Sequence, residues 1–171
     1  GFALKKLGEF YAASIIESTI DFDLLFGPAY KGIPIVSSTA IALSEKHHID
    51  KPYAFNRKEV KDHGEGGWFV GAPISGNILL LDDVITAGTA IKQVIELLHT
   101  QKSATLKTCF VALDRQEKGA NNLTAIEDLA KNHGVYVQSI VTLTDLLTFL
   151  EKAGNQYQKE RDIMIHHFSK N

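Results

Sequence analysis

One stretch of the sequence decides the fold: Ile78-Leu79-Leu80-Leu81-Asp82-Asp83-Val84-Ile85-Thr86-Ala87-Gly88-Thr89-Ala90. The apolar run from Ile78 to Leu81 predicts a strand buried on both faces, as in a parallel sheet covered by helices. Two carboxylates, Asp82 and Asp83, follow directly, and a loop of small residues leads into a helix predicted over residues 89–100. Ligands of open α/β sheets bind at strand-to-helix turns of this kind. The stretch therefore predicts both a fold class and the place of a site.

On both sides of this stretch, apolar runs of strand length alternate with segments of helical period. Strands are predicted over residues 23–26, 53–55, 68–70, 105–113 and 135–141, and helices over residues 11–20, 33–46, 124–132, 144–152 and 156–168. This alternation predicts an α/β fold, a mainly parallel sheet flanked by helices. Residues 56–67 have almost no apolar content, three glycines and dense charge, which predicts a long mobile loop.

Length and composition restrict the class of protein. The chain has 171 residues, of which 44% are hydrophobic and 22% charged, which predicts a single domain over residues 1–171. The formal net charge is −2, so the chain has no excess of basic residues of the kind that is typical of proteins that bind duplex nucleic acid. Cys109, the single cysteine, cannot form an intramolecular disulfide, and its apolar neighbours predict a buried thiol. No apolar run reaches the length of a membrane span, so we expect a cytoplasmic protein.

The acidic pair and the small-residue loop indicate two complementary binding functions. Backbone N–H groups of residues 86–89 would lie free at a helix N-terminus, where the helix dipole favours a phosphate. Asp82 and Asp83 would repel that phosphate and suit ribose hydroxyls, a divalent cation or a developing positive charge. The alternative is a solvated strand end beside an ordinary helix charge. The chain has neither Gly-x-Gly-x-x-Gly after a strand nor the P-loop Gly-x-x-x-x-Gly-Lys, which argues against those nucleotide sites.

Positive charge gathers in further segments. Residues 57–67 contain three cations, a histidine and three glycines, a composition that suits a lid closing over a polyanion. Three acids in the same segment leave open a solvated loop with local ion pairs. Lys31 lies in a strand-to-helix turn, where its ammonium could meet a phosphate, and Arg115 follows a predicted strand and could hold a carboxylate bidentately. Taken singly, each of these two cations would be interpreted as a solvated or ion-paired side chain.

Residues 81–90 resemble the motif with which type I phosphoribosyltransferases bind the ribose 5-phosphate part of phosphoribosyl pyrophosphate (PRPP). Residues 26–34, 56–67 and 113–119 extend this likeness, in order and spacing, to the orotate phosphoribosyltransferase family. The resemblance implies the type I phosphoribosyltransferase fold with a mobile catalytic loop. It also implies transfer of the 5-phosphoribosyl group from PRPP to orotate, which yields orotidine 5′-monophosphate and pyrophosphate in de novo pyrimidine (UMP) biosynthesis.

The resemblance assigns roles to individual positions. It implies PRPP-binding positions at Tyr30, Lys31, Arg57, Lys58, Lys61, His63, Asp82, Asp83, Val84, Ile85, Thr86, Ala87, Gly88, Thr89 and Ala90. It implies orotate-binding positions at Thr86 and Arg115, and we expect Lys61, His63, Asp82 and Asp83 to be catalytic. The implied cofactor is Mg²⁺, held mainly by PRPP and through water by Asp82 and Asp83, with no direct protein ligand. The implied assembly is a homodimer with shared active sites, in which the mobile loop reaches into the partner's site.

One departure from the family pattern lies between Phe10 and Tyr11. The family follows Gly-Glu-Phe with a segment of a few tens of residues that holds a Ser-Gly-Arg-x-Ser-Pro stretch, a PRPP-contacting lysine and paired aromatics that pack on orotate. Here Gly8-Glu9-Phe10 continues directly into Tyr11-Ala12-Ala13. We expect that this segment exists in the protein and is missing from the chain, whose start without Met fits trimming. A genuine deletion would instead remove part of the orotate pocket.

Two other functions compete with this interpretation. A purine phosphoribosyltransferase would share residues 81–90 but have another base pocket, and the segments around Lys31 and Arg115 argue against it. A PRPP-binding regulatory protein would keep the motif without an intact lid and would have a basic face, which the net charge of −2 does not favour. The histidine pairs at 47–48 and 166–167 are interpreted as surface residues, because no acid or cysteine spacing completes a metal site around them.

Overall fold

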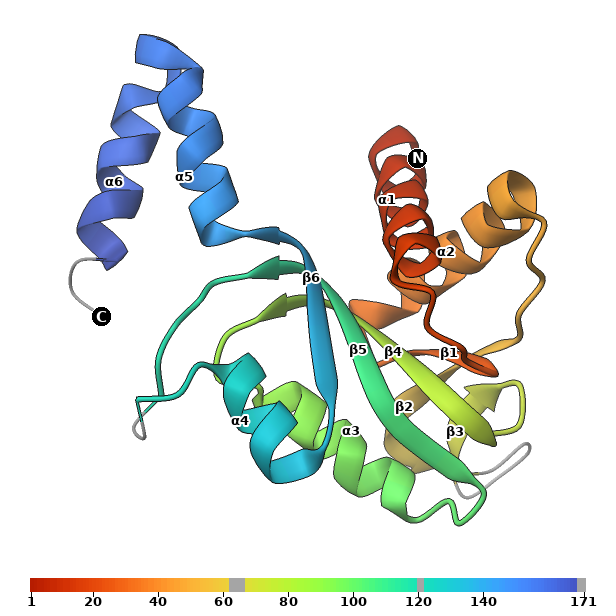
Figure 1. Cartoon of the computed structure of the whole chain (residues 1–171). Helices are drawn as coiled ribbons and strands as arrows, with labels where there is room; N and C mark the ends of the chain where they lie inside the picture. The colour runs from red at the N-terminus through yellow and green to blue at the C-terminus, as the bar shows by residue number, and fades with distance from the viewer. Residues whose placement is uncertain (62–66, 120–121, 169–171) are drawn as a thin grey trace.

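The computed structural model describes residues 1–61, 67–119 and 122–168, and the chain forms a sheet with helices on both faces (Figure 1). The strands are β1 (Leu24–Gly27), β2 (Tyr53–Lys61), β3 (Gly67–Gly71), β4 (Gly76–Ile85), β5 (Ala104–Asp114) and β6 (Tyr136–Thr142). The helices are α1 (Phe2–Ser18), α2 (Gly32–His47), α3 (Thr89–His99), α4 (Ala125–His133), α5 (Leu143–Lys152), the 3₁₀ turn η1 (Gly154–Tyr157) and α6 (Gln158–Phe168).

The described strands form one sheet in the order β3-β2-β1-β4-β5-β6. All neighbouring strands are parallel except β2 and β3, which pair as an antiparallel hairpin at one edge. The mainly parallel α/β fold predicted from the sequence is therefore confirmed.

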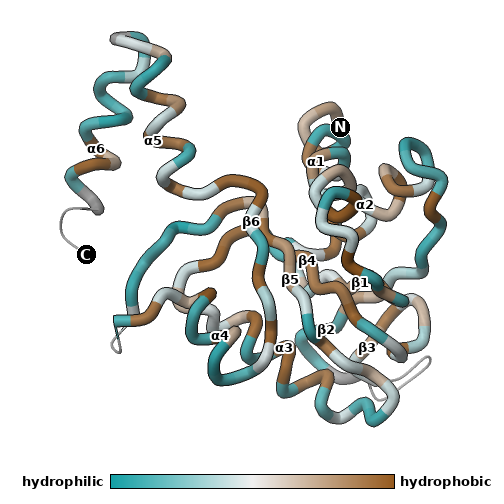
Figure 2. The backbone as a smooth tube through the Cα atoms, viewed as in Figure 1, coloured by the Kyte–Doolittle hydropathy of each residue, from teal (hydrophilic) through white to brown (hydrophobic). Residues whose placement is uncertain are grey.

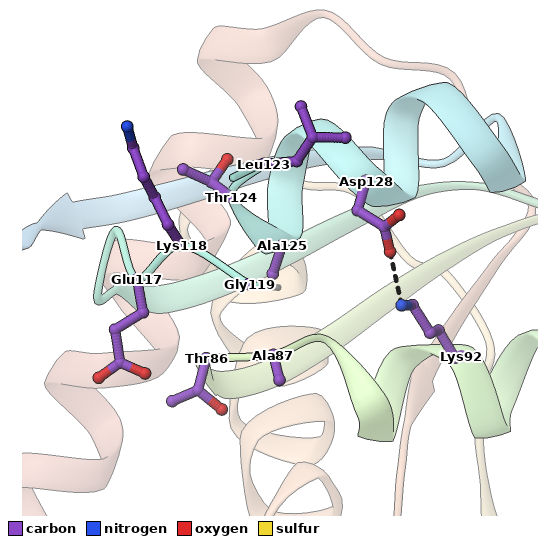
Figure 3. A pocket seen from close by; sticks show the side chains of 10 residues that line it. All are labelled: Thr86, Ala87, Lys92, Glu117, Lys118, Gly119, Leu123, Thr124, Ala125 and Asp128. Carbon is purple, nitrogen blue, oxygen red and sulfur yellow. Dashed lines mark ion pairs between the residues drawn. The ribbon is translucent and has the colours of Figure 1, made fainter. Parts of the chain in front are cut away.

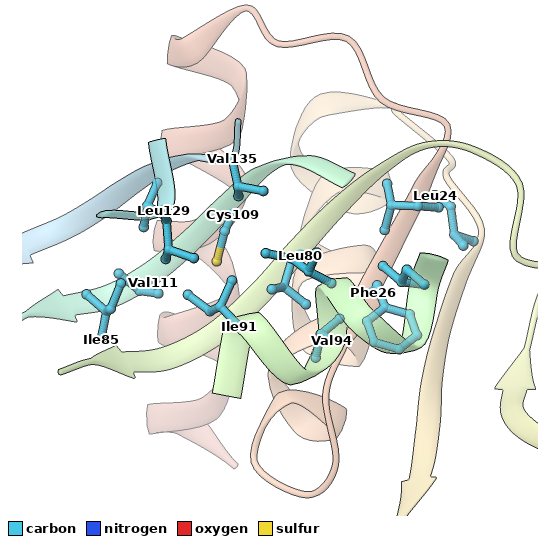
Figure 4. Packing of buried hydrophobic residues seen from close by; sticks show 14 of the residues in the cluster. Leu24, Phe26, Leu80, Ile85, Ile91, Val94, Cys109, Val111, Leu129 and Val135 are labelled. Atoms are coloured by element: carbon cyan, nitrogen blue, oxygen red, sulfur yellow. The ribbon is translucent and has the colours of Figure 1, made fainter. Parts of the chain in front are cut away.

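Both faces of the central strands are covered, as the apolar run in β4 predicts. Ile78 and Leu80 pack with α3 and α4 on one face, and Leu79 and Leu81 pack with α1 and α2 on the other. Figure 4 shows the first of these clusters, in which the predicted buried thiol of Cys109 lies wholly inside. Each such leucine contributes about 1.5–3 kcal/mol of burial free energy.

The colouring by hydropathy follows this layering (Figure 2). The central strands β4 and β5 are largely hydrophobic, whereas α6 is largely hydrophilic and lies beside α5 beyond the end of β6. The polar helix predicted over residues 156–168 is confirmed from Gln158 onward, after a short 3₁₀ turn. None of the helices that the structure describes combines the length and the apolar character needed to cross a bilayer.

The connections place a topological switch point between β1 and β4. From β1 the chain passes through α2 to β2 on one side, and from β4 it passes through α3 to β5 on the other. In open α/β sheets the crevice outside the carboxyl ends of two such strands is where ligands bind. The chain segments that follow β1 and β4 are the turn at residues 28–31 and the small-residue loop at residues 86–88.

Three predicted boundaries were wrong. Residues 56–61 belong to β2 and Gly67 to β3, not to a loop, because an antiparallel edge hairpin can expose one face and so tolerates polar residues. Residues 62–66, the rest of the predicted mobile loop, lie outside the described part of the chain. Helix α1 begins at Phe2 rather than Tyr11. Strand β4 continues to Ile85, because β5 pairs with it that far, so Asp82 and Asp83 lie within the strand.

Candidate active site

The candidate site is built where β1, β2, β4 and β5 end at one edge of the sheet. Lys31 Nζ donates to Asp83 Oδ2 at 2.7 Å, which joins the turn after β1 to β4. The ammonium of Lys58, on β2, lies 5.1 Å from the ring centroid of Tyr30, within the range of a cation–π contact. The structure thus brings together four of the residues predicted to bind PRPP, from three separate segments.

The turn after β1 is held by a residue that the sequence analysis missed. The backbone N–H of Ala29 donates to Asn56 Oδ1 at 2.9 Å, so β2 supports the turn that carries Tyr30 and Lys31. Nothing in the local sequence around Asn56 indicates this role, because the contact joins residues 27 positions apart. Only the pairing of β1 with β2 brings them together.

The two carboxylates occupy different environments. Asp82 is 8% exposed, whereas the Asp83 side chain is 31% exposed and forms the ion pair with Lys31. The backbone N–H of Asp83 donates to Asp82 Oδ1 at 2.9 Å. Burial is the main reason that the pKa of Asp82 rises from its ordinary value of 3.8 to about 6. The site therefore offers one exposed, cation-paired carboxylate and one sequestered carboxylate that takes up a proton in mildly acidic solution.

The small-residue loop ends in an open helix N-terminus. Helix α3 has no side-chain cap at its N-terminus, and Thr89 and Ala90 in its first turn are exposed. Gly88 has a φ of +72°, and a Cβ at this position would lie 3.4 Å from Leu129 Cδ1 on α4. A glycine here allows the backbone to turn tightly against α4. The first-turn N–H groups can therefore bind a phosphate, as residues 86–89 predict.

The predicted orotate-binding residues lie next to each other through the ends of β4 and β5. The backbone N–H of Arg115 donates to the carbonyl of Ile85 at 3.3 Å, so Arg115 sits beside Thr86 at the start of the loop. The Arg115 guanidinium pairs with Glu117 at 2.5 Å. Gln116 in the same turn accepts hydrogen bonds from the backbone and hydroxyl of Thr144. The turn after β5 is thus tied to β4 on one side and to α5 on the other.

A small pocket of about 220 Å³ lies on the α4 side of the loop (Figure 3). Its lining residues are Thr86, Ala87, Lys92, Glu117, Lys118, Gly119, Leu123, Thr124, Ala125 and Asp128. Lys92 on α3 and Asp128 on α4 form an ion pair at 2.5 Å across it. The sequence analysis did not single out these two residues, because nothing in their local sequence indicates that α3 and α4 are neighbours.

Three more of the residues predicted to bind PRPP lie on strands β2 and β4: Arg57, Val84 and Ile85. Arg57 donates to the carbonyl of Gly67 at 3.3 Å and so joins β2 to β3. Val84 is exposed and Ile85 is buried, as expected for successive strand residues. The side chain of Lys61 and the whole of His63 lie outside the described residues. Their predicted catalytic roles stay predictions.

Known proteins resemble this chain in sequence and in fold. The model of the phosphoribosyl transferase domain matches residues 2–143. Orotate phosphoribosyltransferase from Vibrio cholerae is 56% identical over 152 residues, which are 89% of this chain and 71% of that protein. The crystal structure of orotate phosphoribosyltransferase from Francisella tularensis superposes with a TM-score of 0.82 at 34% identity, over 99% of this chain and 80% of that one.

A more distant structure shows the same fold. Orotate phosphoribosyltransferase from Mycobacterium tuberculosis, in complex with 5-phospho-alpha-D-ribosyl 1-diphosphate, superposes with a TM-score of 0.65 at 15% identity, over 84% of this chain and 75% of that one. Together with the matched domain and the close sequence relatives, this confirms the predicted type I phosphoribosyltransferase fold. The chain belongs to the phosphoribosyl transferase domain family and, within it, to the orotate phosphoribosyltransferases.

Proposed function

We propose that this chain transfers the 5-phosphoribosyl group of PRPP to orotate, giving orotidine 5′-monophosphate and pyrophosphate in de novo UMP synthesis. One observation carries the proposal. In a chain of the orotate phosphoribosyltransferase family, the Lys31–Asp83 ion pair, the buried Asp82 and the open N-terminus of α3 meet at the switch point between β1 and β4. This edge offers acceptors for a ribose and donors for a phosphate side by side.

The reaction explains why both kinds of group are needed. The bond from ribose C1 to the pyrophosphate oxygen breaks, and a bond from C1 to the orotate nitrogen forms. The transition state has the character of an oxocarbenium ion, so a cationic ring and an anionic leaving group must be stabilised together. Asp82 and Asp83 serve the ring, and the α3 N-terminus holds the 5-phosphate.

Positive charge serves the leaving group. Lys31, Arg57 and Lys58 supply it, and Lys61, the last residue of β2, and His63 complete the proposed set. Arg115, beside Thr86, would hold the orotate carboxylate and so orient the base nitrogen toward C1, a proximity effect. Arg115 would exchange its partner Glu117 for the substrate carboxylate, or share its guanidinium between the two.

Magnesium is the proposed cofactor, and the donor set fits it. Carboxylate oxygens are the ligands that Mg²⁺ prefers, and it commonly keeps several waters while binding substrate phosphates. Asp83 Oδ2 is occupied by Lys31, and Asp82 is nearly buried, which favours contact through water rather than direct ligation. Bound Mg²⁺ would neutralise charge on the pyrophosphate.

The proposal includes an assembly, a location and a further segment. We propose a cytoplasmic homodimer with shared active sites, which the family resemblance supports. We also propose that the native protein holds a further segment between Phe10 and Tyr11, which are consecutive residues of α1 in this chain, and that this segment completes the orotate pocket. An intact mass above the 18.8 kDa of the present sequence would support this segment. A mass of 18.8 kDa would show a true deletion.

The activity is tested by mixing the full-length protein with PRPP and Mg²⁺, adding orotate, and following the loss of the orotate ultraviolet absorbance. Adenine, guanine and uracil are run in parallel. Turnover that depends on orotate supports the proposal, whereas turnover with a purine would indicate a purine phosphoribosyltransferase. PRPP binding without turnover of any base would indicate a PRPP-binding regulatory protein.

A further inference from the structure

Tyr11 is a wholly buried residue on α1 that contacts the acidic pair on β4. Its hydroxyl donates to the backbone carbonyl of Asp82 at 2.5 Å, across 71 positions of sequence. This hydrogen bond ties α1 to β4 at the position of the acidic pair.

The hydrogen bond from Tyr11 to the Asp82 carbonyl lies where the acidic pair of β4 is aligned with β5. The β4–β5 register passes from Asp82 opposite Val111 to Val84 opposite Leu113. The Tyr11 hydroxyl contacts the backbone carbonyl of Asp82 at this position of the β4–β5 pairing.

The hydroxyl acts on the peptide group that joins the two acids. The carbonyl of that peptide belongs to Asp82 and accepts from Tyr11, and its N–H belongs to Asp83 and donates to the Asp82 carboxylate at 2.9 Å. Because a trans peptide is planar, its carbonyl and N–H point in opposite directions. A group that fixes the direction of the carbonyl therefore also fixes where the N–H points, and with it the position of the Asp82 carboxylate.

We propose that Tyr11 is a positioning residue for phosphoribosyl transfer: its hydroxyl orients the Asp82–Asp83 peptide so that both carboxylates face the ribose. This inference rests on the proposed function, since it takes the acidic pair to bind the ribose of PRPP. Tyr11 itself lies beneath the sheet edge, fully buried among the residues of α1, α2 and the central strands, and touches no substrate.

The variant Tyr11→Phe keeps the ring and removes the hydroxyl. We expect its KM for PRPP to rise about tenfold, the effect of one lost buried hydrogen bond. Its KM for orotate and its affinity for Mg²⁺-pyrophosphate, which has no ribose, should stay within about twofold. The matched control is Tyr136→Phe, at an exposed position on β6, which should leave all three values unchanged.

Two results would overturn the positioning role. One is a folded Tyr11→Phe protein with the wild-type KM for PRPP. The other is an equal loss of affinity for PRPP and pyrophosphate, which would indicate general loosening of the site. If the wild-type protein neither binds PRPP nor turns over orotate, the proposed function fails and the Tyr11 role fails with it. If the wild-type protein turns over orotate and the Tyr11→Phe variant has the same KM for PRPP, the proposed function stands and only the role of Tyr11 is refuted.

A measurement on the wild-type protein covers the case in which Tyr11→Phe does not fold. With tyrosine labelled by ¹³C at Cζ, the Tyr11 signal reports the hydrogen bond of its hydroxyl. Saturation with PRPP and Mg²⁺ should shift this signal, because ribose binding to the two carboxylates changes the hydrogen bond between Tyr11 and the peptide that joins them. Pyrophosphate with Mg²⁺ should not shift it. A Tyr11 signal that is unmoved by saturating PRPP would contradict the proposal.

Discussion

The Nζ of Lys31 lies 2.7 Å from Oδ2 of Asp83, so a cation from the turn after β1 neutralises an acid on β4 across the switch point of the sheet. The contact raises the pKa of Lys31, with the hydrogen bond to Asp83 as the largest cause. Each partner is also proposed to bind a different part of PRPP, the leaving pyrophosphate for Lys31 and the ribose for Asp83. Substrate binding would then exchange this internal ion pair for contacts to the ligand.

Lys31→Ala should therefore impair activity more than stability. The Lys31 side chain is 78% exposed, and ion pairs of exposed side chains contribute little to stability because solvent screens them. We expect the melting temperature to change little and kcat/KM for PRPP to fall by about 10- to 100-fold, the loss of a charge-assisted hydrogen bond. Steady-state kinetics and thermal unfolding measure the two effects. Lys5→Ala, on the first part of α1, is the control, and a similar kinetic loss there would remove the special role of Lys31.

The raised pKa of Asp82 predicts a pH dependence of stability. Because the folded pKa, about 6, lies above the ordinary value of 3.8, the native state binds this proton more tightly than the unfolded chain does. The cost of burying the charge is fully present above about pH 6 and declines as the pH falls from about 6 towards 3.8, so that part of it remains at pH 5. The rise in pKa corresponds to roughly 3 kcal/mol. Asp82→Asn should thus be more stable than wild type at pH 8, by up to that amount, and urea unfolding at pH 5 and pH 8 measures it.

The same proton should weaken substrate binding. Below pH 6 the protonated Asp82 has lost the negative charge that would serve the ribose or the hydrated cation. The affinity for PRPP is expected to fall between pH 7 and pH 5 in the wild-type protein, and to be lower at pH 7 but to fall less steeply in Asp82→Asn, where protonation of the ligand's own phosphates at about pH 6 remains. Calorimetry of both proteins across this range is the measurement. An equally steep fall in the two proteins would argue against a role for the Asp82 charge.

Gly88→Ala should distort the loop before α3. The φ of +72° disfavours any residue with a Cβ, and the added methyl would contact Leu129 and Ala125 on α4. We expect a loss of about 1–2 kcal/mol in the free energy of unfolding and a higher KM for PRPP. Gly134→Ala is a matched control, since Gly134 has a φ of +65° with open space around it at the end of α4. That variant should lose stability with an unchanged KM, and equal kinetic effects in both would show that the loop has no specific role.

Arg115→Gln should act on the other substrate. The guanidinium is proposed to bind the orotate carboxylate, so we expect the KM for orotate to rise by at least tenfold while the KM for PRPP stays within about twofold. Arg161→Gln, on α6, provides an arginine control outside the site. A larger rise in the KM for PRPP than in the KM for orotate would contradict the proposal that Arg115 binds orotate.

Much of the fold followed from local pattern. The run from Ile78 to Leu81 predicted a strand buried on both faces, and the alternation of strands with helices predicted the mainly parallel sheet, because burial by helices on both sides leaves no polar face in the pattern. The small-residue loop after β4 was also predicted as a candidate site, since acids followed by small residues at a strand-to-helix turn have few structural uses. The polar hairpin of β2 and β3 was missed because an edge pair needs no apolar run.

The relations between distant segments depended on tertiary structure. The sequence by itself indicated which residues are proposed to carry the chemistry: the acidic pair, the loop at residues 86–89, Lys31 and Arg115. Only the folded chain decided that Asp82 is buried while Asp83 is paired with Lys31, that Asn56 holds the turn after β1, and that Tyr11 hydrogen-bonds the peptide between the two acids. Such contacts join residues 27 to 71 positions apart, and their geometry depends on the order and register of strands, which no local spacing encodes.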